Sequence, residues 1–459
     1  MSGGAPPAVA VEPGAAFHLV GIGGAGMSAL AQALLDRGVR VTGSDRLRDA
    51  GDAPPIFETL RAAGARLFPQ DGSGVTVGLR AVVASTAVEP GNADLAAASR
   101  QGVPVVHRAE LLAELVRPSR VIAVAGTAGK TTVTAMAGFL LEQLGFDPAV
   151  INGGIAVAWD RPDRVGSVRA GAGGWSVVEV DESDRSLLHF HPAWAVVTNI
   201  SKDHFERDEV ESLFRRFVGQ ASEGVLASPE AAAALGGAAT APLIAAAPPE
   251  DARGGAEGMS FRWRGHEVCL AMPGRHNAEN AALALDLCAA LGANPAAAVV
   301  ALARFRGVRR RLEFVGALRG AAVMDDYAHN PAKIAASWSA VAASGVRVLG
   351  VWRPHGFGPL SLLFDDLVET FAGALESRHS LFLLPVYYAG GTARGERTSD
   401  DLAAAIQARG GAAVAVRGYD ELESAIRREA GPGRTILVMG ARDPGLTAFC
   451  RRLVGPSGG

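Results

Sequence analysis

The sequence contains few cysteines, few aromatic residues and little net charge. Three cysteines, 6% aromatic residues and a formal net charge of −3 are spread over 459 residues. An odd number of widely separated cysteines argues against a disulfide framework and against a zinc knuckle. A chain this close to neutral has no basic footprint for nucleic acid. These shortages exclude a disulfide-stapled secreted scaffold and a nucleic-acid-binding protein.

Long apolar segments are also missing. No uninterrupted apolar run approaches the ~20 residues that a membrane-spanning helix needs. The first sixteen residues are rich in Gly, Pro and Ala, and they have neither the basic start nor the apolar core of a signal peptide. We therefore expect residues 1–16 to be a disordered tail on a cytoplasmic protein that has no membrane partner.

What the sequence does contain is the composition of a globular α/β protein. Hydrophobic residues make up 49% of the chain, and its length allows about three domains. Segments typical of strands alternate with segments typical of helices, which predicts parallel, doubly wound sheets. We expect domain boundaries that give residues 1–117, 118–308 and 309–459.

Strands are predicted where short apolar runs end at glycine or at polar residues. In chain order they cover residues 17–20, 39–42, 81–84, 103–106, 121–125, 176–180, 195–199, 321–324, 347–351, 381–386, 413–416 and 435–439. Helices are predicted over 27–37 and 109–116, and another begins at the N-cap cluster Thr398–Asp400. Residues 219–258 show no clear periodicity and are interpreted as a helix with a variable loop. A hairpin is predicted from 260–263 and 267–272.

The segment from Val124 to Thr132 is the most informative feature of the chain. An apolar run stops at Gly126, passes Gly129, and reaches Lys130 and Thr131 before a helical pattern begins. Backbone N–H groups and the positive end of a helix would then face one point, where a phosphate chain can bind. Lys130 would reach the terminal phosphates, and the Thr131 hydroxyl is a suitable magnesium ligand. A bare glycine turn is the alternative, but such a turn has no need for Lys-Thr at the helix start.

This loop is a short G-T-x-G-K-T form of the phosphate-binding pattern, and it predicts that the protein uses ATP. The residues predicted to hold ATP are Gly126, Thr127, Gly129, Lys130, Thr131 and Thr132.

A second glycine motif lies near the start of the chain. Gly21, Gly23 and Gly26 match G-x-G-x-x-G after a strand, and Asp45 closes the following strand. Taken alone, this motif is typical of a dinucleotide site in which Asp45 holds a ribose, so an NAD-dependent oxidoreductase is one alternative. Such an enzyme does not, however, need a second phosphate loop. Tight packing of strand against helix without any ligand is the other alternative.

Candidate metal ligands follow two of the predicted strands. Glu179 lies at the end of the strand 176–180, and His204 follows the strand 195–199. In a parallel sheet both would lie at the carboxyl edge, beside the phosphate loop. Magnesium prefers oxygen ligands, which favours Glu179 and Thr131; His204 is less usual and could be a structural histidine. The acidic run Asp181–Asp184 could equally be a solvated loop.

Further polar candidates lie later in the chain. Asn277 and Asn280 are three residues apart on a helix, so they share one face and could hold an adenine or a phosphate. Arg309–Arg311 forms a basic cluster that could also be surface charge. Asp325 and Asp326 end a predicted strand, and we expect them outside the core because burial of an unpartnered charge is costly.

Together these motifs resemble the Mur ligase family, whose members are ATP-dependent enzymes that add amino acids to peptidoglycan precursors. The matching segments follow the family's order from residue 17 to about 445, so the resemblance covers nearly the whole chain. They are His18–Ser28, Gly43–Asp45, Arg108–Leu115, the phosphate loop, Glu179–Asp184, Thr198–Ile200 with Asp203-His204, Pro273–Asn277 and Asp325–Tyr327.

The resemblance implies a Rossmann-like UDP-binding domain, a central P-loop ATPase domain with a parallel sheet, and a C-terminal Rossmann-like domain. It implies that the ligand of the first glycine motif is a UDP-sugar rather than NAD. It further implies that ATP and Mg²⁺ are used to join an amine, L-alanine by default, to the carboxylate of UDP-N-acetylmuramate through an acyl phosphate. The alternative amine is a murein peptide, as in recycling, or another substrate of a divergent paralogue. The protein is expected to be a monomer or a homodimer.

Roles for individual residues also follow from the resemblance. Lys130 would hold the phosphates, Thr131 and Glu179 one magnesium, and Glu179 with His204 a second. Asn277 and Asn280 would contact ATP, and Arg311 and Asp326 would complete that site from the third domain. The UDP-sugar residues would be Gly21, Gly23, Gly24, Gly26, Met27, Ser28, Asp45 and Ser85. Tyr327, His329 and His355 would lie at the acyl and amine end.

The sequence departs from the family pattern at a few positions. Ala128 and Asn330 stand where histidine is usual, and the segment 353–359 has Gly356, Phe357 and Pro359 where Tyr and two Arg are usual. These changes lie around the acyl and amine end and leave the ATP-site residues intact.

Overall fold

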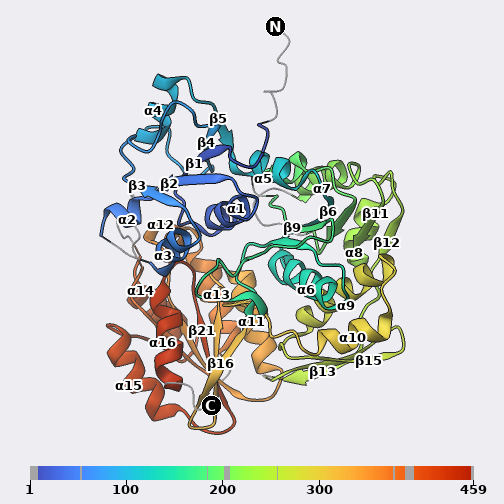
Figure 1. The fold of residues 1–459 in the computed structure, drawn as a ribbon. Helices are drawn as coiled ribbons and strands as arrows, with labels where there is room; N and C mark the ends of the chain where they lie inside the picture. The colour runs from blue at the N-terminus through green and yellow to red at the C-terminus, as the bar shows by residue number, and fades with distance from the viewer. Residues whose placement is uncertain are drawn as a thin grey trace. The chain divides into compact units, whose positions relative to one another are not determined.

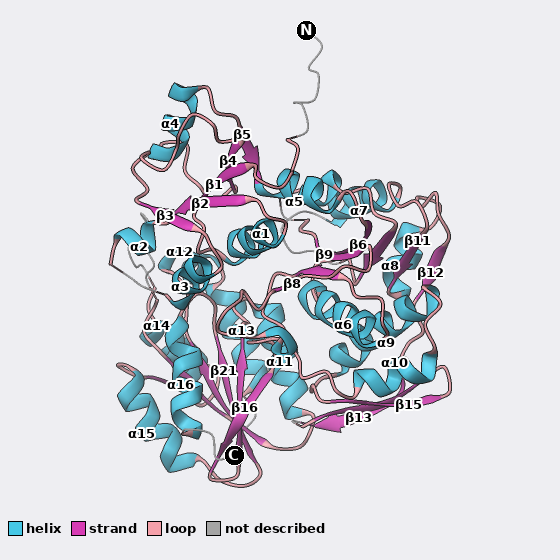
Figure 2. Ribbon diagram, in the orientation of Figure 1, coloured by secondary structure: helices cyan, strands magenta, loops and turns pink. Residues whose placement is uncertain are grey.

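The computed structural model describes residues 9–51, 54–182, 184–200, 207–255, 257–375, 378–387 and 397–455. The chain divides into two compact units, one of Met1–Pro248 with Glu279–Phe305 and the other of Pro249–Ala278 with Arg306–Gly459. Figures 1 and 2 show that each unit is built from sheets covered by helices. The predicted α/β class with largely parallel sheets is confirmed.

The first sheet of the first unit has five parallel strands in the order β3-β2-β1-β4-β5. Its strands are β1 (Ala16–Val20), β2 (Arg40–Ser44), β3 (Arg66–Phe68), β4 (Ala81–Ala84) and β5 (Val105–His107). The helices are α1 (Ala25–Asp36), α2 (Arg46–Asp49), α3 (Pro55–Ala62), α4 (Ala93–Gln101) and α5 (Arg108–Val116). This is the Rossmann-like arrangement that the sequence predicts, with β3 as an additional strand. β3 is missed because three residues are too few to display a period.

The prediction that residues 1–16 are disordered is wrong for residues 9–16. Val9 and Val11 pack against the hydrophobic core of the first unit, and the Gly14 N–H donates to the Gly38 carbonyl at 2.9 Å. Two apolar side chains within a Gly/Pro/Ala-rich stretch are enough to hold the segment against the sheet. Residues 1–8 lie outside the described residues.

The second sheet of the first unit has seven strands in the order β12-β11-β10-β6-β9-β7-β8. They are β6 (Arg120–Ala125), β7 (Ala149–Ile151), β8 (Val168–Arg169), β9 (Trp175–Glu179), β10 (Trp194–Val197), β11 (Gly224–Ala227) and β12 (Leu243–Ala245). All pairings are parallel except that of β8 with β7. The helical elements are α6 (Lys130–Gln143), η1 (Val157–Trp159), η2 (Ser186–His189), α7 (Arg207–Val218), α8 (Pro229–Leu235) and α10 (Pro295–Leu302).

The interpretation of residues 219–258 as a helix with a loop is wrong in part. The segment contains the short buried strand β11, the helix α8, the strand β12 and all of β13 (Glu250–Gly255). Strands of three or four residues among alanine and glycine carry no clear alternation. Their place is fixed by pairing with β10 and with one another.

The second unit contains two sheets. An antiparallel sheet consists of β13, β14 (Gly258–Trp263) and β15 (His266–Leu270), which confirms the predicted hairpin. A six-stranded sheet has the order β16-β17-β21-β18-β19-β20. Its strands are β16 (Glu313–Leu318), β17 (Ala321–Asp326), β18 (Arg347–Trp352), β19 (Ser380–Leu383), β20 (Ala413–Ala415) and β21 (Arg434–Met439).

The six-stranded sheet is doubly wound, with one departure from the prediction. Five of its strands are parallel, as expected, but β16 is an antiparallel edge strand. Apolar side chains of one face pack with α11 (Pro331–Ala342), α13 (Phe364–Ala374) and α14 (Ser399–Ala408), and those of the other with α15 (Tyr419–Glu429) and α16 (Pro444–Val454) (Figure 1). The short helix α12 (Phe357–Leu362) and α9 (Arg275–Ala290), which begins in this unit and ends in the first, complete the described helices.

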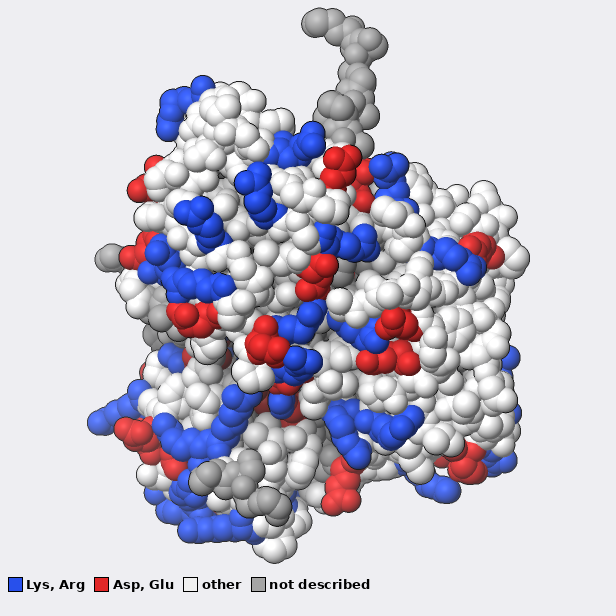
Figure 3. Space-filling model, viewed as in Figure 1, with Lys and Arg blue, Asp and Glu red and all other residues white. Residues whose placement is uncertain are grey.

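Polar and charged side chains stabilise the ends of helices in the second unit. α14 begins with a capping box between Thr398 and Asp401, as its N-cap cluster predicts. α15 and α16 each carry two arginines in their last turn, and Figure 3 shows blue side chains gathered over these helices. Cations near the last turn of a helix interact favourably with its dipole.

Cys269 is exposed, Cys288 and Cys450 are buried, and all three are free. Burial raises the pKa of the Cys288 thiol to about 12, in keeping with a structural thiol in α9. Among the described residues, no helix combines the length and the apolar character needed to cross a membrane.

Candidate active site

The phosphate loop joins β6 to α6, as the sequence predicts. Gly126 has φ 140° and Gly129 has φ 82°, a region that L side chains rarely adopt. A Cβ atom on Gly126 would lie 1.9 Å from the Thr198 hydroxyl oxygen, and one on Gly129 would lie 2.7 Å from Oδ1 of Asn280. Both glycines are therefore required by backbone conformation and by close neighbours.

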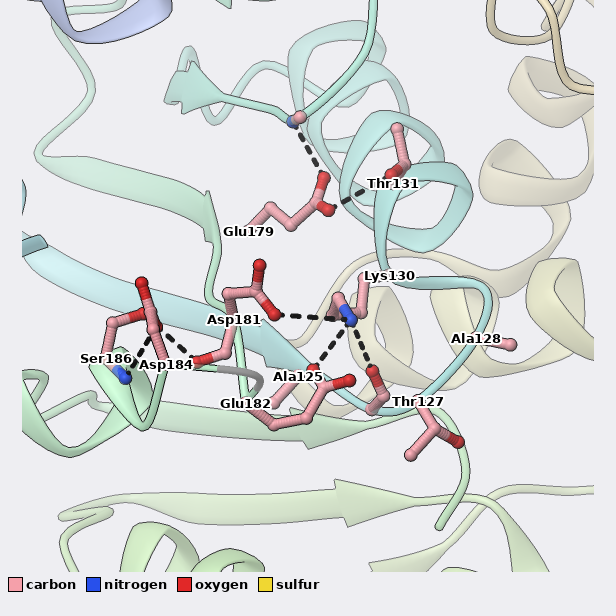
Figure 4. A network of polar contacts seen from close by, with 12 residues as sticks. Ala125, Thr127, Ala128, Lys130, Thr131, Glu179, Asp181, Glu182, Asp184 and Ser186 are labelled. Carbon is pink, nitrogen blue, oxygen red and sulfur yellow. Dashed lines mark hydrogen bonds and ion pairs between the residues drawn. The ribbon is translucent and has the colours of Figure 1, made fainter. Parts of the chain in front are cut away.

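Lys130 is held at this loop by acidic side chains (Figure 4). Its ammonium lies 2.7 Å from Oε2 of Glu182 and 3.9 Å from Oδ1 of Asp181, and it donates to the Gly126 carbonyl at 2.8 Å. Glu182 is 2% exposed. Burial raises the pKa of the Glu182 carboxyl, and the neighbouring ammonium opposes that change. Sequence reasoning left this acidic run open as a solvated loop; Glu182 is instead a buried counter-ion.

Thr131 and Glu179 meet as predicted. The Thr131 hydroxyl donates to Oε1 of Glu179 at 3.1 Å, and the other carboxylate oxygen accepts from the Gly153 N–H at 2.7 Å. Glu179 is the last residue of β9, which pairs with β6, so both groups lie at the carboxyl edge of one sheet. A hydroxyl beside a carboxylate is an oxygen donor set that suits a hard cation.

The remaining predicted metal ligand, His204, lies outside the described residues. Within the part of the chain that the structure describes, no group of three His, Cys, Asp or Glu side chains is placed to hold a metal ion. A cation at Thr131 and Glu179 would therefore need phosphate or water oxygens to complete its coordination.

Two residues after β10 anchor the phosphate loop. Asn199 accepts at Oδ1 from the Thr127 hydroxyl at 2.6 Å and from the Ala128 N–H at 2.9 Å, and its Nδ2 donates to the Ala128 carbonyl at 3.0 Å. The Thr198 hydroxyl donates to the same carbonyl at 2.5 Å. These contacts fix the loop backbone. Sequence reasoning gave neither residue a role, although their place after a strand next to β6 is a signal that could have done so.

The two asparagines of α9 have different surroundings. Asn280 is half-buried and adjoins Gly129 of the phosphate loop. Asn277 is buried, and its Nδ2 donates to the Pro273 carbonyl at 2.7 Å. The structure thus brings Asn280 to the loop, whereas the observed contact of Asn277 closes the start of its own helix.

Asp325 and Asp326 are buried, which corrects the expectation that they lie outside the core. Asp325 is 0% exposed and Asp326 is 6% exposed. Both have partners: Asp325 accepts from the Thr447 hydroxyl at 2.6 Å and from Nε of Arg310 at 3.3 Å. Burial raises the pKa of Asp325 to about 6, partly offset by the charge of Arg310.

Asp326 fixes the turn that carries Arg311. Its carboxylate accepts from the N–H groups of Leu312 at 2.7 Å and Ala328 at 2.8 Å. Arg311 lies between two residues with positive φ, Arg310 at 59° and Leu312 at 48°, and its guanidinium lies 5.5 Å from the centre of the Tyr327 ring. Arg311 and Asp326, which are predicted to contribute to one site, are thus connected through the backbone of one strained turn.

Tyr327, His329 and His355 form a row of edge-to-face rings, with centroids 5.4 and 5.2 Å apart. Nδ1 of His329 lies 2.9 Å from the Tyr327 carbonyl. Burial lowers the pKa of His329 to about 4 and also lowers the pKa of His355. Both imidazoles are therefore neutral near pH 7 and available as hydrogen-bond partners.

The first glycine motif forms a tight turn between β1 and α1. The Gly23 N–H donates to Oδ2 of Asp45 at 2.9 Å, and Oδ1 of Asp45 accepts from the Leu47 N–H at 3.0 Å. A Cβ atom on Gly23 would lie 2.6 Å from the Phe57 ring. Asp45 therefore organises backbone on both sides, and Gly23 is required by packing.

The other residues predicted for the UDP-sugar surround the start of α1. Gly21 has φ 72°, Gly24 is the N-cap, and Gly26 adjoins the Arg108 guanidinium. Met27 is buried in the core, the buried Ser28 donates its hydroxyl to the Ala25 carbonyl at 3.1 Å, and Ser85 follows β4.

The two glycine loops at the starts of α1 and α6, with the lysine and carboxylates beside the second, define an α/β enzyme that binds nucleotides. Family sequence models match the chain in three places: Mur ligase family, catalytic domain, over residues 16–120; Mur ligase middle domain over 124–213; and Mur ligase, glutamate ligase domain, over 310–442.

Relatives also match over nearly the full length of the chain. A UDP-N-acetylmuramate–L-alanine ligase of Paracoccus denitrificans is 38% identical over 460 residues, with 93% of each chain covered. The protein of that name from Jannaschia is 36% identical over 452 residues, covering 93% of this chain and 92% of the relative. The chain belongs to the Mur ligase family.

Solved structures have the same fold. The UDP-N-acetylmuramate–alanine ligase of Thermotoga maritima is 25% identical, has a TM-score of 0.77, and covers 95% of this chain and 98% of its own. A murein peptide ligase of Psychrobacter arcticus, at 21% identity and a TM-score of 0.67, covers 96% and 98%.

Proposed function

We propose that this protein is an ATP-dependent ligase that joins L-alanine to the carboxylate of UDP-N-acetylmuramate in peptidoglycan precursor synthesis. The structural observation that carries the proposal is the convergence, at the start of α6, of the Lys130 ammonium with the Thr131–Glu179 pair. The relatives that share 36–38% identity over 93% of the chain are named for this activity.

The chemistry follows from where charge develops. A carboxylate oxygen of the sugar substrate attacks the γ-phosphorus of ATP, and ADP leaves with the electrons of the broken P–O bond. The L-alanine amine then attacks the acyl carbon, loses a proton and expels phosphate. Lys130 and the loop N–H groups stabilise the phosphoryl oxygens, since preorganised donors at developing charge contribute most to such a step.

Magnesium fits the oxygen set at this edge. The Thr131 hydroxyl and the Glu179 carboxylate would hold it, with His204 proposed as a ligand of a second ion. When bound, the metal neutralises phosphate charge. Glu179 is kept in place by the Gly153 N–H, so its second oxygen is already oriented before any cation is held.

The remaining site residues are proposed in the roles that the family pattern implies. Gly126, Thr127, Gly129, Lys130, Thr131, Thr132 and Asn280 would hold ATP, with Asn277, Arg311 and Asp326 contributing to the same substrate. The turn from Gly21 to Ser28, with Asp45 and Ser85, would hold the UDP-sugar. Tyr327, His329 and His355 would lie at the acyl and amine end, where neutral imidazoles can accept or donate hydrogen bonds.

A murein peptide as the amine is not favoured. The relatives of higher identity are named for L-alanine, and the murein peptide ligase shares 21% identity, which supports a common fold alone. We further propose that the enzyme acts in the cytoplasm, where ATP is supplied, and as a monomer or homodimer; light scattering on the purified chain tests the latter.

The test is release of inorganic phosphate from ATP in the presence of UDP-N-acetylmuramate, with candidate amines added one at a time. L-Alanine is expected to give the highest kcat/KM, with an amide product detected by mass spectrometry. Turnover with a murein peptide and none with L-alanine would reassign the amine. Absence of phosphate release with every amine would overturn the ligase proposal.

A further inference from the structure

Three acidic residues between β9 and η2 lie beside cations that adjoin the two glycine loops of the first unit. Asp181 and Glu182 pair with Lys130 of the phosphate loop. Asp184 lies 3.7 Å from the Arg108 guanidinium and 3.8 Å from Nε2 of His107. We refer to Asp181, Glu182 and Asp184 as the acidic trio. Three residues close together in the chain thus lie between Lys130 at the phosphate loop and Arg108 beside the first glycine loop.

Arg108 lies directly against the first glycine loop. It is the first residue of α5, and its terminal nitrogen lies 3.2 Å from the position of a Cβ atom on Gly26, in the first turn of α1. The side chain is 25% exposed. A guanidinium with five N–H donors therefore lies beside the N-terminus of a twelve-residue helix.

The pairing of Arg108 with Asp184 is loose. A distance of 3.7 Å exceeds that of a charge-assisted hydrogen bond, which is about 2.7–2.9 Å. Asp184 itself is oriented by the Ser186 N–H at 2.9 Å. A half-buried arginine that has a carboxylate within reach, but outside hydrogen-bond distance, can exchange that partner for a more highly charged anion at little cost.

We propose that Arg108 binds the diphosphate of the nucleotide sugar, and that Asp184 is the counter-ion with which this diphosphate competes. The inference rests on the proposed function, in which the Gly21–Gly26 turn receives that diphosphate. Glycine N–H groups, the positive end of α1 and a guanidinium that can form two parallel hydrogen bonds make a complementary set for such an anion.

The acidic trio makes the two sites dependent on each other. When triphosphate oxygens bind Lys130, Glu182 loses that counter-ion and faces added negative charge, which disfavours the present position of the trio. Asp184 is two residues from Glu182, so its displacement frees Arg108. ATP is therefore expected to strengthen binding of the nucleotide sugar, and by thermodynamic linkage the nucleotide sugar strengthens binding of ATP to the same degree.

Calorimetry on the full chain tests this inference. UDP-N-acetylmuramate is titrated with and without β,γ-methylene-ATP and Mg²⁺, and the ratio of the two dissociation constants measures the coupling. For the unmodified protein we expect a ratio of about 5–50, within the usual range for coupled sites. Asp184→Asn should bind the nucleotide sugar more tightly without the ATP analogue, and its ratio should fall to near 1.

Two further variants separate the roles. Arg108→Ala should weaken nucleotide-sugar binding by roughly tenfold or more, Arg108→Lys should weaken it less, and Asp184→Asn should have no effect in the Arg108→Ala background. Asp163→Asn removes a carboxylate from an exposed arginine pair elsewhere on this unit and is the matched control, with an unchanged ratio. Thermal unfolding verifies that each variant is folded.

The outcomes distinguish the two proposals. Unmodified protein that does not bind UDP-N-acetylmuramate would contradict the proposed function. Unmodified protein that binds it, while Asp184→Asn binds equally or more weakly without the analogue, would contradict the role of Asp184. An unaltered affinity in folded Arg108→Ala would remove Arg108 from the site.

Discussion

The Lys130 ammonium pairs with the buried Glu182 carboxylate in this structure, and a bound phosphate chain would compete with that carboxylate for it. Its distance of 2.7 Å from Glu182 means that removal of the lysine leaves a carboxylate in a site where it is 2% exposed. Breaking a buried pair by removing one partner is strongly destabilising, whereas replacing both partners is often neutral. The catalytic and structural contributions of Lys130 can therefore be measured separately.

We predict that Lys130→Ala lowers the rate of ligation by about 10²–10³-fold or more and the free energy of unfolding by roughly 3 kcal/mol. The double variant Lys130→Ala/Glu182→Gln should recover most of that stability and none of the activity. Phosphate release and chemical denaturation give the two quantities. Arg161→Ala is the control, because Arg161 forms an exposed ion pair with Asp163. Wild-type turnover in either variant would refute the ATP-site assignment.

Glu179 gives a second prediction at this scale. Because a carboxylate is a better ligand for a hard cation than an amide, Glu179→Gln should raise the Mg²⁺ concentration for half-maximal rate, by about tenfold. Gln can still accept the Gly153 N–H, so stability should change little. His204→Ala should have a smaller effect. Glu142→Gln, on the same α6 helix but paired with Arg169 and Trp159, should behave as wild type; unchanged curves for Glu179→Gln and His204→Ala would remove both from the metal site.

At the scale of elements, Asp325 and His329 lie at or just after the end of β17. Their burial has opposite effects on how the free energy of unfolding depends on pH. The pKa of Asp325 is raised from 3.8 to about 6, and that of His329 is lowered from 6.5 to about 4. A carboxyl with a raised pKa binds more protons in the folded state, so its contribution to stability falls as pH rises from about 4 to 6. A histidine with a lowered pKa binds fewer, so its contribution rises over about pH 4 to 6.5.

The two effects should nearly cancel in the unmodified protein, each being on the order of 3 kcal/mol. We predict that Asp325→Asn makes the free energy of unfolding increase with pH between 4 and 6, whereas His329→Gln makes it decrease. Urea denaturation at a series of pH values measures both slopes. Parallel curves for the unmodified protein and both variants would show that neither group titrates as its burial requires.

At the scale of the whole molecule, each unit has its own hydrophobic clusters, and the first unit holds both glycine loops. Its two sheets are joined by polar contacts: Arg164 pairs with Asp36 of α1, and the Val165 N–H donates to the side-chain carbonyl of Gln32 at 3.3 Å. The first sheet is therefore supported by the second, and ligand binding is best measured on the full chain.

We predict that the full chain binds UDP-N-acetylmuramate and does not bind NADH. Both ligands carry a diphosphate that suits the turn from Gly21 to Gly26, but hydride transfer has no use for the second phosphate loop. Gly23→Val should abolish binding, because its side chain would overlap the Phe57 ring and displace the turn. Calorimetry with each ligand gives the answer, and NADH binding without UDP-sugar binding would overturn the assignment of the first glycine motif.

Much of this protein is determined by local sequence. Alternation of short apolar runs with helical periods placed most strands of the three largely parallel sheets, and the order of glycine, lysine and threonine placed the phosphate loop between β6 and α6. These features are local because a strand, a turn and a helix start depend on residues within a few positions of one another. Glu179 was also predictable, since the end of a parallel strand fixes the edge at which its side chain lies.

Only the tertiary structure decided which charges are buried and which residues are partners. Glu182 against Lys130, Arg108 against Gly26, and Asp325 against Arg310 and Thr447 are contacts between segments far apart in the chain, and they depend on strand order and on which face each strand presents. Short strands such as β3 and β12 carry no period of their own and form because a neighbouring strand offers unpaired backbone groups. The sequence alone determines the elements and the kind of chemistry, whereas the packing of those elements determines which charges remain available to a ligand, because desolvation and pairing are properties of the folded chain.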